Sequence, residues 1–266
     1  MALREIYSKQ DLAINAVGKH IRKMFRQRVI DYNYPAIVKL AYNDAITYNP
    51  ETGKGGTVMG LNFRKQKRNK FNLPYVGIIE NMLYLKKFEA DARFDPLSNS
   101  DYLQSWSIVA IKETGGPDLT EHHKIGRVDA TSEEDLEGAD AIPDPDKGAS
   151  AFRDLFYKKG FSDKDLVALS YVYMFGVFKT AYQRSYTNHS VFSNAYYQFL
   201  ANSNKSHNHS LDKILLGDAA LKEYVELFAE NKKEFHNAFT DAYLKLHTLG
   251  NDDKPFYLEI DQSLAY

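Results

Sequence analysis

Polar side chains that could take part in chemistry stand in two otherwise apolar stretches of the chain. Residues 39 to 43 read Lys-Leu-Ala-Tyr-Asn and supply a cation, a phenol and an amide through Lys39, Tyr42 and Asn43. Residues 168 to 176 contain Tyr173, and a carboxylate follows further along the chain at Asp212. An amide cannot take up a proton near neutral pH, so Asn43 is not a candidate general base. Lys39, Tyr42 and Asp212 are polar groups that could bind a small molecule.

Both stretches are predicted to lie on helices. Apolar residues recur at helical spacing, Pro35 suits the first turn of one helix, and Ser162 with Asp165 has the spacing of a capping box before another. Residues 256–260 could form a strand or an extended arm. The sequence therefore predicts a mainly α protein. The predicted helices span residues 14–25, 35–48, 75–87, 100–114, 150–159, 162–178, 218–230 and 232–249.

Two long stretches lack a helical period. Residues 118–148, rich in Asp, Glu and Pro, are predicted to form a surface loop, and residues 182–210 are crowded with Asn, Ser and Tyr. The chain shows no internal repeat and no sharp break in composition. We therefore expect a single domain over residues 1–266.

Composition excludes several classes of function. The formal net charge of −1 provides no global attraction to nucleic acid or to a membrane surface, and no nucleic-acid partner is expected. The absence of cysteine excludes disulfides, thiolate catalysis and cysteine-bound metal centres. No apolar run approaches the roughly 18 residues that span a bilayer, so we expect a soluble protein without a transmembrane segment.

Charged and histidine clusters offer local alternatives. Five basic residues could dock an anionic partner, although a solvated loop is the simpler interpretation. The histidines at 122 and 123, and at 207 and 209, could bind a metal ion. Loop histidines without a framework of carboxylates are more often solvated, so no metal site is predicted. The basic residues are Arg64, Lys65, Lys67, Arg68 and Lys70.

Nearly the whole chain resembles ascorbate peroxidase, a class I haem peroxidase of plants and algae. Residues 113–117 (Glu-Thr-Gly-Gly-Pro) resemble that family's Val-Thr-Gly-Gly-Pro, and residues 126–129 resemble its Gly-Arg-x-Asp. Residues 162–170 resemble its Thr-Asp-x-Asp-Ile-Val-Ala-Leu-Ser. The resemblance implies a haem-peroxidase-type helical fold, with two helical lobes around a former haem cleft. The distal lobe would comprise about residues 1–147 and 240–266, and the proximal lobe about residues 148–239.

The resemblance also implies that the reactive residues have been exchanged. The family's distal Arg, Trp and His are matched by Lys39, Tyr42 and Asn43, so these are degenerate positions and no catalytic residue is expected. The haem-ligating His is matched by Tyr173, and the carboxylate that bonds to that His is matched by Asp212. Tyr173 and Asp212 would therefore bind a cofactor only if haem is present.

Two further matches bear on ligand binding. Arg184 aligns with an arginine that contacts ascorbate in the plant enzymes, which is weak evidence for a retained substrate. Around Tyr173, small residues of the family are replaced by Tyr171 and Met174, so we expect protein side chains to fill the haem slot.

Three hypotheses of function follow. The first is a haem-free pseudoperoxidase that acts as a structural or partner-binding subunit of a larger complex, without a cofactor. It resembles the haem-less ascorbate-peroxidase-like proteins of the thylakoid lumen, which share the phrase at residues 39–48. That resemblance implies a chloroplast protein whose transit segment is absent, with cytoplasm or mitochondrion as alternatives. The second hypothesis is a haem-binding oxidoreductase with Tyr173 as axial ligand. The third is a non-redox enzyme that uses the emptied cavity.

Overall fold

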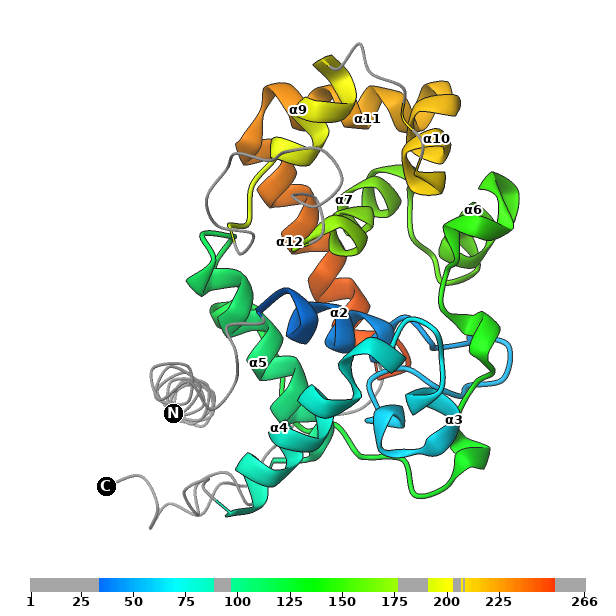
Figure 1. The fold of residues 1–266 in the computed structure, drawn as a ribbon, viewed down its shortest axis with the longest axis vertical. Helices are drawn as coiled ribbons and strands as arrows, with labels where there is room; N and C mark the ends of the chain where they lie inside the picture. The colour runs from blue at the N-terminus through cyan, green and yellow to red at the C-terminus, as the bar shows by residue number, and fades with distance from the viewer. Residues whose placement is uncertain (1–33, 89–96, 177–190, 203–206, 208, 252–266) are drawn as a thin grey trace, which may run out of the picture.

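The fold is built from helices wherever the structure describes the chain. The computed structural model describes residues 34–88, 97–176, 191–202, 207 and 209–251. Within these residues the chain forms ten α-helices and no strand, which confirms the mainly α prediction for the described part. The helices (Figure 1) are α2 (Tyr34–Ala45), α3 (Arg64–Lys67), α4 (Val76–Phe88), α5 (Asn99–Glu113), α6 (Ala149–Lys158), α7 (Asp163–Met174), α9 (Ala195–Asn202), α10 (Ser210–Gly217), α11 (Ala219–Glu230) and α12 (Lys232–Thr248).

Some of the predicted features lie outside the described residues. These are the opening helix at residues 14–25, the tail at residues 256–260 and Arg184. Within the described ranges, no helix combines the length and the apolar character that a membrane crossing requires. The proposed division into distal and proximal lobes stays a prediction.

Helices α2 and α5 form the centre of the molecule and pack against each other (Figure 1). Every residue of α2 after Tyr34 is buried, and so is every residue of α5 from Ser100 to Ile111. A helix that buries its whole circumference belongs to a core. The start of α5 is fixed because the Ser98 hydroxyl accepts a hydrogen bond from the backbone N–H of Asp101 at 2.9 Å.

A second group of helices, α7, α9, α11 and α12, packs around an aromatic core. Phe192 lies at its centre, with ring centroids 4.6 Å from Tyr171, 4.8 Å from Phe239 and 5.5 Å from Phe235. The predicted capping box is present, since the Ser162 hydroxyl and the Asp165 carboxylate each accept a backbone N–H of the other. Helix α12 also contacts α2 and so connects this group with the first one (Figure 1).

The predicted end of α7, at residue 178, lies too far along the chain. The helix stops at Met174, Phe175 adopts an extended backbone, and Gly176 has a φ of +79°. A Cβ atom at Gly176 would lie 2.5 Å from the Cβ of Pro35, so the end of α7 touches the start of α2. Only glycine combines the positive φ with this close approach, and the contact brings the two predicted site helices together.

Two predictions about irregular segments need correction. Residues 118–148 are irregular, but they are not only surface, because Leu119, Ile125, Leu136 and Ile142 are buried in the core. The segment 182–210, which showed no period, contains α9 and begins α10. Helix α9 buries its tyrosines and Leu200 and exposes Gln198 and Asn202. Because the helix has only eight residues, this pattern is too short to show a clear helical period in the sequence.

Candidate functional site

Tyr42 of α2 and Tyr173 of α7 meet face to edge between the two helices. Their hydroxyl oxygens lie 3.4 Å apart, and their ring centroids are 5.6 Å apart at an interplanar angle of 73°. The Tyr173 hydroxyl donates a hydrogen bond to the carbonyl of Pro143 at 2.5 Å. The rings of Phe71 and Phe152 flank Tyr173 at 6.2 and 6.0 Å. The structure thus brings together two of the predicted site residues that are 131 positions apart in the sequence.

A cavity of about 300 Å³ opens beside this tyrosine pair. Helix α2 contributes one wall, and α7 contributes Val172 and Tyr173 to another. The remaining walls come from the segment after α3, which includes Lys70 of the basic cluster, from the turn before α6 and from His209. The sequence did not place these residues in one site with α2 and α7. The lining residues are Lys39, Tyr42, Asn43, Lys70, Phe71, Pro74, Tyr75, Asp144, Pro145, Asp146, Val172, Tyr173 and His209.

The polar residues of α2 differ in their hydrogen-bond and ion-pair partners. The Asn43 amide donates hydrogen bonds to Asn72 Oδ1 at 2.8 Å and to the Phe71 carbonyl at 3.3 Å, so it fixes the segment after α3. Lys39 lines the cavity with 9% of its surface exposed, and no carboxylate of the described residues lies within ion-pair distance of it. Burial lowers the pKa of the Lys39 ammonium to about 8.

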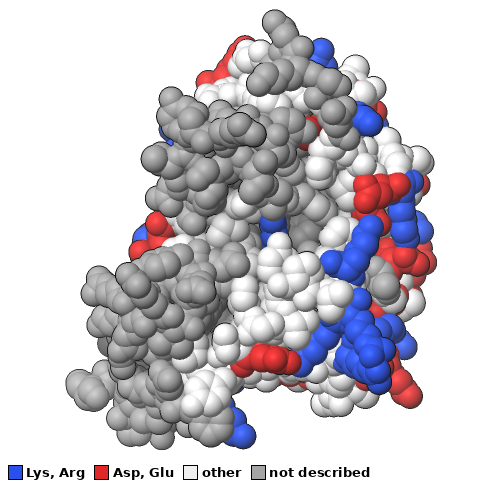
Figure 2. All heavy atoms as spheres, in the orientation of Figure 1, with Lys and Arg blue, Asp and Glu red and all other residues white. Residues whose placement is uncertain are grey.

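The basic cluster is partly engaged with the protein itself. Its first residues form the short helix α3, Lys67 lies 3.6 Å from Glu80, and Lys70 lies 2.5 Å from Asp144. The segment is solvated as interpreted, since Arg64, Lys65, Arg68 and Lys70 are exposed, but its first four residues form a helix and not a loop. Figure 2 shows basic side chains gathered on the surface over α3. Binding of an anionic partner there stays a prediction.

Asp212, which the resemblance matched to the carboxylate beside the iron ligand, has a hydrogen-bond partner within the protein. It is fully buried in α10 and accepts a hydrogen bond from the Tyr196 hydroxyl at 2.8 Å. His207 Nδ1 lies 3.8 Å from its other oxygen. Asp212 does not line the cavity, so the structure separates it from Lys39 and Tyr42.

Tyr171 and Met174 do not fill the space between the helices. Both are buried, but Tyr171 points into the aromatic core around Phe192, and neither residue lines the cavity. Tyr173 occupies that space instead. Within the described residues, no three His, Cys, Asp or Glu side chains gather closely enough to hold a metal ion.

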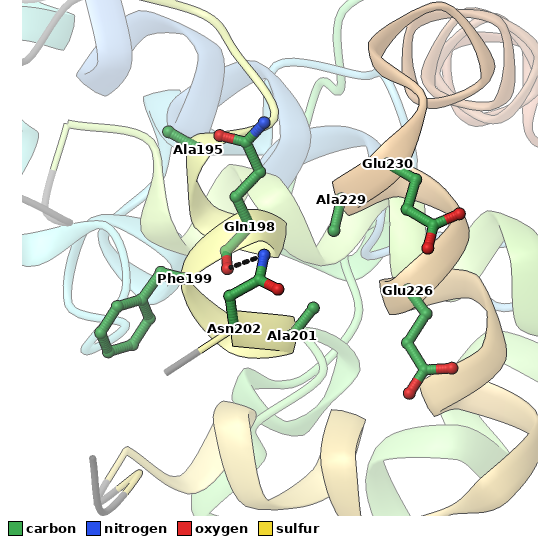
Figure 3. Close-up of a pocket in the computed structure, with 8 residues that line it drawn as sticks. All are labelled: Ala195, Gln198, Phe199, Ala201, Asn202, Glu226, Ala229 and Glu230. Carbon is green, nitrogen blue, oxygen red and sulfur yellow. Dashed lines mark hydrogen bonds between the residues drawn. The ribbon is translucent and has the colours of Figure 1, made fainter. Parts of the chain in front are cut away.

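A second hollow, of about 750 Å³, lies between α9 and α11 (Figure 3). Figure 3 shows Glu226 and Glu230 on α11 across from Gln198 and Asn202 on α9, and the Asn202 amide donates to the Gln198 carbonyl at 3.1 Å. All four of these side chains are exposed. The hollow is therefore a surface groove and not an enclosed chemical site.

The comparison with known proteins agrees with the resemblance found in the sequence. The model of the family described as Peroxidase matches residues 17–231. The chain belongs to the peroxidase family. The cytosolic L-ascorbate peroxidase 2 of Arabidopsis thaliana is 30% identical over 258 residues, which are 95% of this chain and 96% of that protein. The probable peroxisomal L-ascorbate peroxidase 3 of Oryza sativa is 30% identical over 222 residues, covering 81% of this chain and 73% of the relative.

A more distant relative in the peroxidase family is the mitochondrial cytochrome c peroxidase of Cryptococcus neoformans. It is 27% identical over 246 residues, which are 81% of this chain and 61% of that protein. These relatives confirm that the chain is a homologue of class I haem peroxidases.

Two observations at Tyr173 bear on haem binding between α2 and α7 in this peroxidase homologue. Peroxidases hold the iron through a histidine, and the matching position here is Tyr173. A tyrosine binds iron as its phenolate, but the Tyr173 O–H donates to Pro143, and burial raises the pKa of Tyr173 well above its usual range. The Tyr42 and Tyr173 hydroxyls also lie 3.4 Å apart between the two helices.

Proposed function

We propose that this chain is a catalytically degenerate peroxidase homologue that binds no haem and acts as a structural or partner-binding subunit. The observation that carries the proposal is the 3.4 Å contact between the hydroxyls of Tyr42 and Tyr173. In the peroxidase arrangement implied by the sequence, these positions lie on opposite sides of the haem. Here the two side chains touch each other.

The distal side supports the same proposal. A peroxidase needs a base that moves a proton between the peroxide oxygens and a cation that stabilises charge as the O–O bond breaks. Asn43 cannot serve as that base, and its amide is occupied by Asn72 and the Phe71 carbonyl. Lys39 keeps a cation but lacks the planar fork of an arginine.

The alternative is a haem protein with Tyr173 as the axial ligand. Its support is that Tyr173 lines the cavity and that phenolate ligands occur in catalases. It requires Tyr173 to lose its proton, to leave the Pro143 carbonyl and to separate from Tyr42. We therefore favour the haem-free function. The chloroplast, possibly the thylakoid lumen, is proposed as the compartment on the phrase at residues 39–48, and one relative is a chloroplastic L-ascorbate peroxidase of Arabidopsis thaliana.

Turnover of ascorbate and hydrogen peroxide tests the proposal. After addition of haemin, the protein should oxidise ascorbate no faster than the same concentration of free haemin, because it holds neither the iron nor a distal base. The measurement is the loss of ascorbate absorbance. The cytosolic L-ascorbate peroxidase 2 of Arabidopsis thaliana, treated identically, serves as the positive control. Turnover above that of free haemin that disappears in Tyr173→Phe would establish the alternative instead.

A further inference from the structure

Lys39 is a buried cation without a counter-charge in the described part of the protein. It is 9% exposed, and no carboxylate of the described residues lies within ion-pair distance of its amine. The other lysine of the cavity differs, since Lys70 is paired with Asp144 at 2.5 Å and lies 3.7 Å from Asp146. A buried ammonium without a partner is unfavourable, and proteins normally pair such groups.

The space beside Lys39 has the size and the walls of a small-molecule site. Lys39 lines the cavity of about 300 Å³, a volume at the lower end of the range for small-molecule sites. Much of the cavity wall is apolar or aromatic, from Phe71, Pro74, Tyr75 and Val172. Such walls favour a flat apolar body over a strongly hydrated one.

Tyr42 supplies a second donor close to Lys39. The two residues are three positions apart on α2, so they lie on the same face of the helix, and both line the cavity. The Tyr173 hydroxyl gives its proton to Pro143, so Tyr42 must be the donor in the contact with Tyr173. At 3.4 Å that bond is long, and a closer acceptor in the cavity would compete for the Tyr42 proton.

We propose that this cavity binds a small aromatic monocarboxylate, with the carboxylate on the Lys39 ammonium and the Tyr42 hydroxyl and the ring against Phe71 and Tyr75. One carboxylate group has two acceptor oxygens, which matches the two donors. A second carboxylate on the ligand would meet Asp144 and Asp146, so dicarboxylates are disfavoured. The proposal rests on the haem-free function, because a haem would occupy this space.

The test uses 4-fluorobenzoate as the probe and ¹⁹F NMR line broadening as the readout, on the whole chain. We expect saturable binding with a Kd of about 1 mM or below. The neutral isostere 4-fluorobenzamide should bind roughly tenfold more weakly, since it loses a charge-assisted hydrogen bond. Lys39→Met should weaken binding of 4-fluorobenzoate by about the same factor. Lys112→Met, which removes an exposed cation that is paired with Asp118 and does not line the cavity, is the control and should change the Kd less than about threefold.

The outcomes separate this proposal from the function on which it rests. Equal binding of the two probes, or unchanged affinity of a folded Lys39→Met variant for 4-fluorobenzoate, would overturn the carboxylate site. If the wild-type protein does not bind 4-fluorobenzoate, that result alone overturns the carboxylate site. An absorption spectrum of the same sample is recorded with haemin. A stoichiometric haem band there would instead overturn the haem-free function.

Discussion

Replacing Arg127 with methionine should lower the free energy of unfolding by about 3–5 kcal/mol, because it leaves the Asp101 carboxylate buried without its cation. Both side chains are almost fully buried, and Arg127 Nη1 lies 2.9 Å from Asp101 Oδ1. Arg127 Nη2 also donates to the His247 carbonyl at 2.9 Å, which ties the irregular segment to α12. Urea denaturation of wild type and variant measures the difference.

The control for this prediction is the double variant Asp101→Asn with Arg127→Met. Removing both charges should recover part of the lost stability, because no Asp101 carboxylate then lies buried without its cation. Lys112→Met, which breaks an exposed pair with Asp118, should change the stability by less than about 1 kcal/mol. A loss for Arg127→Met as small as that for Lys112→Met would show that the buried pair does not fix the segment.

Replacing Lys39 with methionine should have the opposite effect and raise the free energy of unfolding at pH 7. The pKa of Lys39 falls from 10.5 to about 8 in the folded protein, so folding disfavours its charged form. A shift of this size corresponds to roughly 3 kcal/mol, as an upper bound. The penalty is fully present below pH 8, declines between pH 8 and 10.5, and is absent above that range.

The measurement is urea denaturation of wild type and Lys39→Met at pH 7 and pH 10. The stability difference in favour of the variant should shrink as the pH rises, since wild-type Lys39 is then neutral in the folded state. Lys70→Met is the matched control and should show no such gain at pH 7, because Lys70 is exposed and paired with Asp144. A constant difference at both pH values would mean that the buried ammonium is not the cause.

The sequence predicted the long helices, including α2 and α7, because apolar residues at helical spacing and residues typical of helix ends mark such segments. The Ser162 capping box is an example in which local chemistry fixes a helix start. The motif at residues 126–129 proved to be structural. Arg127 pairs with Asp101, and the Asp129 carboxylate accepts the backbone N–H groups of Asn99 and Ser100 at the start of α5.

The remaining features depend on contacts that no local pattern reveals. Tyr196 donates a hydrogen bond to Asp212 from α9, a helix that the sequence analysis did not predict. The Pro143 carbonyl accepts a hydrogen bond from Tyr173, although its segment was predicted to be a surface loop. Phe192 fills the aromatic core from the aperiodic stretch before α9. The resemblance matched Tyr173 to the family's ligating histidine, but the contact of Tyr173 with Tyr42 depends on the packing of α7 against α2.

The most direct test of the haem-free function is an absorption spectrum of the purified protein, recorded before and during titration with haemin. The contact between Tyr42 and Tyr173 predicts no saturable Soret band at one equivalent of haemin, because the two side chains meet instead of standing on opposite sides of a haem. A Soret band that saturates at one equivalent and disappears in Tyr173→Phe would contradict the account and establish a haem protein with a tyrosine ligand.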